Sequence, residues 1–300
     1  MEERFVEVAD GVLVRRHARL DLNVGLVVGA ERCLVVDTRE TPAQAHDLRA
    51  EVRRVTSLPW VVANTHGHHD HCFGNATFLP GQIWGHERCA SMLRDYGDLQ
   101  RQLVRRAAAE AGEEALADGL GDVQIVPPDH TFAYRARIDL GGREVVLRHV
   151  GLGHTDNDVV VEVPGAAVFA GDLVEEGAPP AFEDAFPLDW PTTAGRVAEA
   201  ATDLPVVPGH GGIVDARFVR EQAALLEAVA RVAREAFAVG RSPADVATEL
   251  PDLPSEVVAT AVARAHRQLR GEPPYPPPAV IRAELGLACD AGSTPTDQEG

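Results

Sequence analysis

The feature that most constrains this chain is the stretch from Thr65 to His71, which reads Thr-His-Gly-His-His-Asp-His. It places four histidines and one aspartate within six consecutive residues. Buried neutral imidazoles need hydrogen-bond partners, so such a cluster is poor material for a hydrophobic core. Imidazole and carboxylate are common ligands of zinc and related metals. Because the cluster directly follows the apolar run at 60–63, we interpret it as a metal site rather than an exposed polar loop.

The spacing within the cluster indicates more than one metal. His66 and His68 are two residues apart, so on an extended backbone their side chains point to the same side. Asp70 and His71 follow at once and can present a second pair after a turn. One short loop can therefore offer two ligands to each of two metal ions.

Composition and charge limit the classes of partner. The chain has 300 residues, of which 45% are apolar, enough for a substantial core. Its formal charge is −18, which disfavours nucleic acid and anionic membranes as partners. A small-molecule substrate is the remaining expectation. We find no secretory leader and no apolar run of about 20 residues, and the cysteines show no paired spacing. These features predict a cytoplasmic protein in which Cys72 is a small buried hydrophobe and not a ligand.

The order of the predicted elements indicates an α/β fold. Short strands are predicted at 5–8, 12–15, 23–28, 33–36, 61–63, 82–84, 136–140, 144–150, 159–163, 167–170 and 205–207. Helical patterns are predicted from 41 to about 56, from 86 to about 117 and over 192–202. The helical segment after residue 86 is either a lid over the site or an outer packing layer. The candidate ligands all follow predicted strands, where α/β folds place their sites.

The last part of the chain has a different character. Apolar residues at helical spacing follow Asp215, and shorter helices are predicted from Ser242-Pro243 and from Pro254-Ser255 to about Leu269. We predict a catalytic domain at 1–215, a helical region at 216–272 that covers the site or forms a homodimer contact, and a proline-rich connector with a tail at 273–300. The tail is predicted to be disordered from about residue 290.

The sequence resembles the metallo-β-lactamase superfamily over roughly residues 5–215. Five motifs carry the resemblance in order: Asp37 at the end of an early strand, Thr65–His71, Gly153-His154-Thr155, Gly171-Asp172 and Pro208-Gly209-His210. The resemblance implies a four-layer αββα sandwich with metals at one edge. The helical region after the last histidine is broadly similar to that of glyoxalase II.

The resemblance also implies a ligand for each metal position. The ligands of the first metal would be His66, His68 and His154, and those of the second would be Asp70, His71 and His210. Asp172 would bridge both metals, as in the glyoxalase II and lactonase-like branches. Asp37 would lie behind the ligands and hold one histidine in orientation. His69, His86 and His149 lie outside the pattern.

This ligand set predicts a reaction. Two divalent metal ions can share one water and make it hydroxide near neutral pH. Zinc is the expected metal, although iron and manganese accept the same ligands. We expect the hydroxide to attack an ester, thioester, lactone or amide of a small molecule, with Asp70 orienting the nucleophile or relaying a proton. No Gly-x-Ser-x-Gly motif for a serine nucleophile is present.

Three alternative functions remain open at this point. The first is a β-lactamase, which the bridging Asp172 and the lack of an export signal disfavour. The second is a mononuclear iron oxidoreductase of the persulfide dioxygenase type, which would use only two histidines and one aspartate. The third is a metal-binding protein without catalysis. The substrate is expected to depend on the 86–130 segment, the loop at 173–191 and the helical region.

Overall fold

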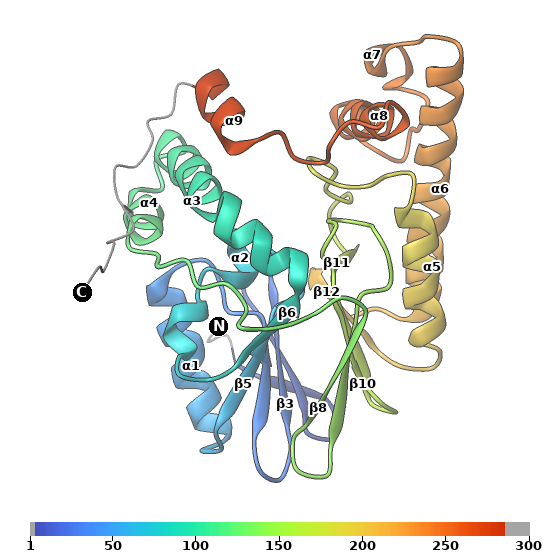
Figure 1. Cartoon of the computed structure of the whole chain (residues 1–300). Helices are drawn as coiled ribbons and strands as arrows, with labels where there is room; N and C mark the ends of the chain where they lie inside the picture. Colours follow the sequence, from blue (N-terminus) through green and yellow to red (C-terminus); the bar gives the residue numbers. More distant parts are fainter. Residues whose placement is uncertain (1–3, 286–300) are drawn as a thin grey trace, which may run out of the picture.

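In the computed structural model, which describes residues 4–285, two β-sheets lie face to face with helices on both outer faces. Figure 1 shows α1, α3 and α4 on one side of the sheets and α5 and α6 on the other. The predicted αββα sandwich with additional C-terminal helices is confirmed. No helix among these residues is long and apolar enough to cross a membrane.

The first sheet is formed by the N-terminal part of the chain. Its seven strands, in spatial as well as sequence order, are β1 (Val6–Ala9), β2 (Val12–Arg16), β3 (Asn23–Val28), β4 (Cys33–Val36), β5 (Trp60–Ala63), β6 (Ile83–His86) and β7 (His130–Phe132). The pairs from β1 to β4 are antiparallel, and those from β4 to β7 are parallel. The short strand β7 has no counterpart in the sequence prediction.

The second sheet completes the sandwich. Its five strands lie in the order β12 (Val206–His210), β11 (Ala167–Glu175), β10 (Val160–Val163), β9 (Glu144–Arg148) and β8 (Arg135–Asp139). Only the β11–β12 pair is parallel. Valine, leucine and phenylalanine side chains of both sheets, including Leu34, Leu147 and Phe169, pack between them. This close-packed apolar layer fixes the position of one sheet relative to the other. Residues at the neighbouring edges of the two sheets therefore keep fixed distances from one another.

The helices cover the outer faces. They are α1 (Pro42–Val55), α2 (His69–Cys72), η1 (Asn75–Phe78), α3 (Glu87–Glu110), α4 (Glu114–Gly121), α5 (Trp190–Ala200), α6 (Ala216–Ala238), α7 (Pro243–Val246), α8 (Ser255–Leu269) and α9 (Pro278–Leu285). As predicted, α1 begins after Thr41, whose hydroxyl accepts a hydrogen bond from the Gln44 amide. α5 precedes residue 215 and α6 follows it, and the two helices pack against each other across the predicted boundary. The division into domains at residue 215 therefore stays a prediction.

Two further parts of the secondary structure differ from the prediction. Only a connector and a tail were predicted after residue 273, yet α9 forms there and lies against α3. Its first residue is Pro278, which suits a helix start because no amide donor is needed there. The predicted disorder from about residue 290 lies outside the described residues.

The second difference concerns Asp172. It was expected to follow a strand that ends at residue 170, but β11 continues through Asp172 to Glu175. Gly171 has a φ of +53°, and the pairing of β11 with β12 is irregular around it. Such an irregularity redirects a side chain without ending the strand. Asp172 therefore lies within the strand, and His210 is the last residue of β12.

Candidate metal centre

The histidine-rich loop begins where β5 ends, and a buried carboxylate fixes its start. Thr65 donates two hydrogen bonds to Asp37, from its backbone amide to Oδ1 and from its hydroxyl to Oδ2, each 2.8 Å long. Asp37 follows β4, and its φ of +66° lies in the left-handed region, where aspartate is tolerated better than most residues. The chain then passes His66 and His68 and turns into α2, which carries Asp70 and His71.

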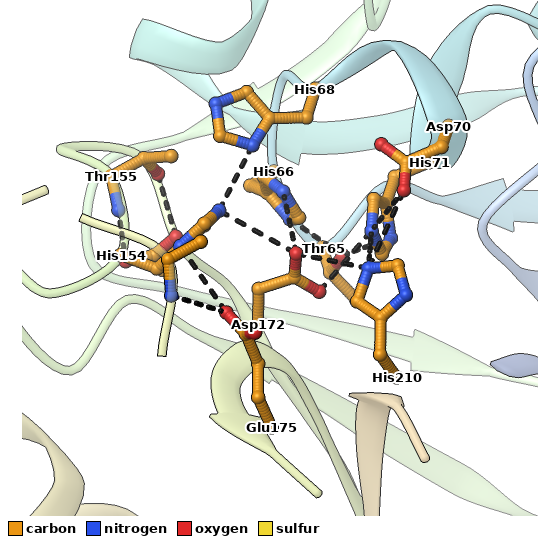
Figure 2. A network of polar contacts seen from close by, with 12 residues as sticks. Thr65, His66, His68, Asp70, His71, His154, Thr155, Asp172, Glu175 and His210 are labelled. Atoms are coloured by element: carbon orange, nitrogen blue, oxygen red, sulfur yellow. Dashed lines mark hydrogen bonds and ion pairs between the residues drawn. The ribbon is translucent and has the colours of Figure 1, made fainter. Parts of the chain in front are cut away.

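A first group of candidate ligands is drawn from three separate parts of the chain. His66, His68, His154 and Asp172 place ligand atoms within 4.8 Å of one another. His154 Nε2 lies 2.9 Å from His68 Nδ1, and Asp172 Oδ2 lies 3.5 Å from His154 Nε2 and 3.7 Å from His66 Nε2. Figure 2 shows the three imidazoles directed toward the Asp172 carboxylate.

A second group lies beside the first. Asp70, His71 and His210 also place ligand atoms within 4.8 Å of one another. The Nε2 atoms of His71 and His210 are 3.4 Å apart, and Asp70 Oδ2 lies 3.5 Å and 3.4 Å from them. Asp172 reaches this group too, with Oδ1 3.2 Å from His71 and Oδ2 3.3 Å from His210. The Asp172 carboxylate is therefore shared by the two groups (Figure 2).

The separations between these atoms suit a metal ion. Zinc–nitrogen bonds of about 2.0–2.1 Å in a tetrahedron place neighbouring ligand atoms about 3.3–3.4 Å apart. Every contact within the second group lies between 3.4 and 3.5 Å. The approach of Asp172 to β12 depends on Gly209, because a Cβ atom there would lie 1.7 Å from Asp172 Oδ1.

The hydrogen bonds behind the histidines decide which nitrogen carries the lone pair. His71 Nδ1 donates to Asp37 Oδ2 at 2.9 Å, and His210 Nδ1 donates to the Leu20 carbonyl oxygen at 2.7 Å. In neutral imidazoles the two Nε2 atoms are then both acceptors, and two acceptors facing each other at 3.4 Å cannot form a hydrogen bond. A metal ion between them, or a proton on one of them when no metal is bound, resolves the conflict, so the donor set fits a metal.

Hydrogen bonds behind the first group also direct the lone pairs of its histidines inward. His68 Nε2 lies 3.0 Å from Asp184 Oδ2, to which it donates, so Nδ1 is left to face the group. His66 Nδ1 contacts the Thr65 hydroxyl at 3.1 Å, which leaves Nε2 as the free lone pair. His66 Nε2 and Asp172 Oδ1 are buried and have no hydrogen-bond partner among the described residues. Buried polar atoms left in this way are costly unless a ligand satisfies them.

The electrostatics of the centre favour added positive charge. Burial alone would lower the pKa of His210, but the carboxylates of Asp172 and Asp70 raise it to about 10. Burial would raise the pKa of Asp70, but His71, His69 and His210 lower it to about 2. The carboxylates therefore stay ionised inside the protein, and a cation beside them compensates their charge.

Sequence reasoning missed two acidic residues that support the ligands, Glu175 at the end of β11 and Asp184 in the loop after it. Asp184 orients His68, and Glu175 Oε1 lies 3.8 Å from His154 Nδ1. The Asp184 backbone is held in turn by Arg264 of α8, whose Nη2 donates to the Asp184 carbonyl oxygen at 2.8 Å. Nothing in the sequence distinguishes Asp184 from the other acidic residues nearby, because only the folded loop brings it to His68.

Several nearby residues are not part of either group. His69 belongs to neither group, since its Nε2 lies 3.6 Å from Glu40 Oε2 and its Nδ1 lies 3.5 Å from Asp70 Oδ1. His86 donates to the Ala133 carbonyl oxygen at 2.9 Å, and His149 donates to that of Asp158 at 2.9 Å. Cys72 is buried, and its thiol donates to the His68 carbonyl oxygen. These four residues lie where the sequence analysis expected them, outside the ligand set.

The segment after β6 packs against neighbouring apolar residues and also contacts the histidine-rich loop. α3 buries Leu93 and Ala108 in an apolar cluster with Ala117 and Leu120 of α4. Gln100 of the same helix donates from Nε2 to the Gly67 carbonyl oxygen at 3.1 Å, between His66 and His68. α3 therefore forms part of a packing layer and also contacts the histidine-rich loop, while its role as a lid stays a prediction.

Comparisons with known proteins agree with this geometry. A curated relative, the metallo-beta-lactamase type 2 of Bacteroides fragilis, is 26% identical over 191 residues, which are 62% of this chain and 67% of that protein. Among solved structures, a metallo-beta-lactamase from Pontibacter korlensis has a TM-score of 0.57 at 21% identity, with 75% of this chain and 99% of that chain covered.

A second solved structure, the metallo-beta-lactamase FIM-1 from Pseudomonas aeruginosa in its mono-zinc form, also has a TM-score of 0.57, at 19% identity, with 77% and 97% covered. At these identities the two structures show a shared fold. The sequence model of the metallo-beta-lactamase superfamily matches residues 19–229, which include every residue of the two ligand groups. This chain therefore belongs to the metallo-beta-lactamase superfamily.

Proposed function

We propose that this protein is a metal-dependent hydrolase that holds two divalent ions, zinc by preference, and cleaves an ester, thioester, lactone or amide of a small molecule. The observation that carries the proposal is the position of Asp172, whose carboxylate contacts ligand nitrogens of both groups at 3.2 to 3.7 Å. A shared carboxylate of this kind supports the glyoxalase II and lactonase-like branch.

The chain's own residues supply the ligands and their orientation. The first ion would be held by His66, His68 and His154, the second by Asp70, His71 and His210, with Asp172 between them. When bound, such a pair of ions acts as a Lewis acid and lowers the pKa of bound water toward neutrality. Neighbouring side chains of the protein would keep these ligands in their orientation.

Two carboxylates perform that orienting work. Asp37 and Asp184 each accept the outward N–H of a ligand histidine, which fixes the tautomer and directs the lone pair inward. We assign to Asp70 the orientation of the attacking nucleophile, because its Oδ2 lies 3.5 Å from His71 Nε2 and 3.4 Å from His210 Nε2, where the second ion would be held. Only folding within a rigid sandwich keeps these groups aligned, since a displacement of about 1 Å can cost 100-fold in rate.

A β-lactamase is the second candidate function. The curated relative and the similar structures named above carry that description, and this is the observation that favours it. The shared carboxylate of Asp172 favours the first candidate, because a bridging aspartate is the mark of the lactonase-like branch implied by the sequence motifs.

One experiment separates the two candidates. Zinc-loaded protein is assayed against matched substrates: phenyl acetate, a phenylacetyl thioester, a phenylacetylated homoserine lactone, a simple anilide and nitrocefin. Turnover of an ester, thioester, lactone or anilide without turnover of nitrocefin supports the proposal. Turnover of nitrocefin alone would make the protein a β-lactamase. Absence of turnover with all five, at full metal loading, would overturn hydrolysis as the function.

A further inference from the structure

The C-terminal segment between α8 and α9 lies beside the loop that carries Asp184, the partner of His68. Figure 1 shows it crossing from the α8 side of the molecule to the α3 side, beyond the ends of β11 and β12. Arg264 of α8 ties it to the loop that supports His68, because Nη1 donates to the Pro274 carbonyl oxygen at 3.1 Å and Nη2 to that of Asp184 at 2.8 Å. The segment is therefore anchored and does not simply trail from α8.

Tyr275 is the side chain that this segment presents inward. Its ring lies against the ring of Tyr96 on α3, with centroids 5.6 Å apart. Its hydroxyl oxygen is buried and has no hydrogen-bond partner among residues 4–285. A buried hydroxyl without a partner costs about 1–3 kcal/mol, and such atoms in native structures often mark a place where a ligand binds.

The charges around the hydroxyl place it on the His68 and His154 side of the centre. Burial raises the pKa of Tyr275 well above its ordinary value, and the negative charges of Asp184, Asp156 and Asp158 raise it further. Asp184 is the partner of His68, and Asp158 accepts two hydrogen bonds from Thr155, the neighbour of His154. The phenol consequently stays protonated and is available as a hydrogen-bond donor.

The same surroundings limit what the hydroxyl can bind. Asp156 and Asp184 would repel an anionic group at this position. Arg264 supplies one positive charge here, which the two carboxylates outnumber, and its Nε, Nη1 and Nη2 each already donate to a backbone carbonyl oxygen, those of Ala185, Pro274 and Asp184. The chain contains no lysine at all. An uncharged oxygen, such as that of a carbonyl group, is the acceptor that fits.

We propose that Tyr275 is a specificity-determining residue whose hydroxyl donates a hydrogen bond to an uncharged oxygen of the substrate, beside the bond that the metal centre cleaves. The proposal rests on the hydrolase function proposed above. It names a substrate class: neutral esters, lactones or amides that carry an oxygen acceptor and an apolar group able to lie against the Tyr275 and Tyr96 rings.

The first test does not depend on turnover. The chain has only three tyrosines, Tyr96, Tyr134 and Tyr275, so protein labelled with 3-fluorotyrosine gives three ¹⁹F resonances, assigned with Y275F and Y134F. Zinc-loaded labelled protein is titrated with N-benzyl-2-pyrrolidinone, a neutral lactam that resists hydrolysis. The Tyr275 resonance should shift and saturate, while that of Tyr134, which is 80% exposed, should stay in place. A Tyr275 resonance that does not move over the titration overturns the assignment.

The second test uses the neutral substrates that the wild-type protein turns over. Y275F keeps the ring and removes only the hydroxyl, so KM should rise and kcat/KM should fall about 3- to 10-fold, the usual value of one neutral hydrogen bond. Y134F is the matched control and should match the wild type in kcat/KM. Wild-type KM and kcat/KM in Y275F would refute the role of Tyr275 and leave the hydrolase proposal standing. Should the wild type hydrolyse nothing, the hydrolase proposal fails and the ¹⁹F titration alone decides whether Tyr275 contacts a ligand.

Discussion

His71 donates a hydrogen bond of 2.9 Å from Nδ1 to Oδ2 of Asp37, a residue held in the left-handed region at a φ of +66°. A strained backbone persists where the surrounding structure maintains it, and here the same carboxylate also accepts from Thr65 twice. The contact joins the end of β4 to α2 and directs His71 Nε2 toward His210. Asp37, which follows β4, thus links the first sheet to His71 of the candidate metal centre.

Replacing Asp37 with asparagine tests this connection. An asparagine of the same shape can present an N–H to His71 Nδ1 and favour the wrong tautomer, so the zinc affinity should fall about 10- to 100-fold. The measurement is zinc competition against a chromophoric chelator. D118N, which changes an exposed carboxylate on α4, should bind zinc like the wild type. Equal zinc affinity for D37N and D118N would contradict the role of Asp37.

Arg264→Ala tests whether α8 supports the centre. Three backbone carbonyl oxygens, those of Asp184, Ala185 and Pro274, would lose their donor, so the free energy of unfolding should fall by about 1–3 kcal/mol. Because Asp184 orients His68, zinc affinity should weaken as well. Urea denaturation and the zinc competition assay measure the two effects. R231A, which removes an exposed contact with Glu235 on α6, is the control, and zinc affinities that do not differ between the variants would exclude the support.

The pH dependence of stability should contain a contribution from His86, away from the metal ligands. Burial, with His149 nearby, lowers the pKa of His86 from 6.5 to about 4. Between these values the unfolded chain binds a proton at His86 and the folded chain does not, so the free energy of unfolding falls as the pH drops through this window.

The variant H86Q isolates that contribution. It keeps a donor for the Ala133 carbonyl oxygen but cannot take up a proton, so its stability should fall less than that of the wild type between about pH 7 and pH 5. Urea midpoints at the two pH values give the comparison, and the exposed His46→Gln serves as the control. The result against this account is an equal loss of stability in H86Q, H46Q and the wild type.

The sequence predicted which side chains come together, because motif residues are local signals. The loop at 65–71 carries four candidate ligands by itself, and the glycines beside His154, Asp172 and His210 mark close backbone approach. The structure brings all seven residues into two adjacent groups. The sandwich was predicted from the resemblance to the metallo-β-lactamase superfamily, while turn residues indicated most of its individual strands.

The supporting residues were not predictable, because their roles depend on tertiary contacts. Asp184 meets His68 across 116 positions of the chain, and Arg264 meets Asp184 across 80. The extension of β11 through Asp172 was missed because Gly171 reads as the end of a strand, although it only bends this one. The helix α9 was missed because the prolines before it indicate an extended chain, and its packing against α3 is a long-range contact.

The metal-to-protein ratio tests the central claim most directly. Wild-type protein and D172N are equilibrated with excess zinc, desalted and analysed for zinc and protein, with circular dichroism to show that both are folded. Since Asp172 contacts nitrogens of both groups, the account predicts two zinc ions per wild-type chain and a loss at both positions in D172N. A wild-type chain that holds one zinc ion or none, or a folded D172N that keeps two, would contradict it.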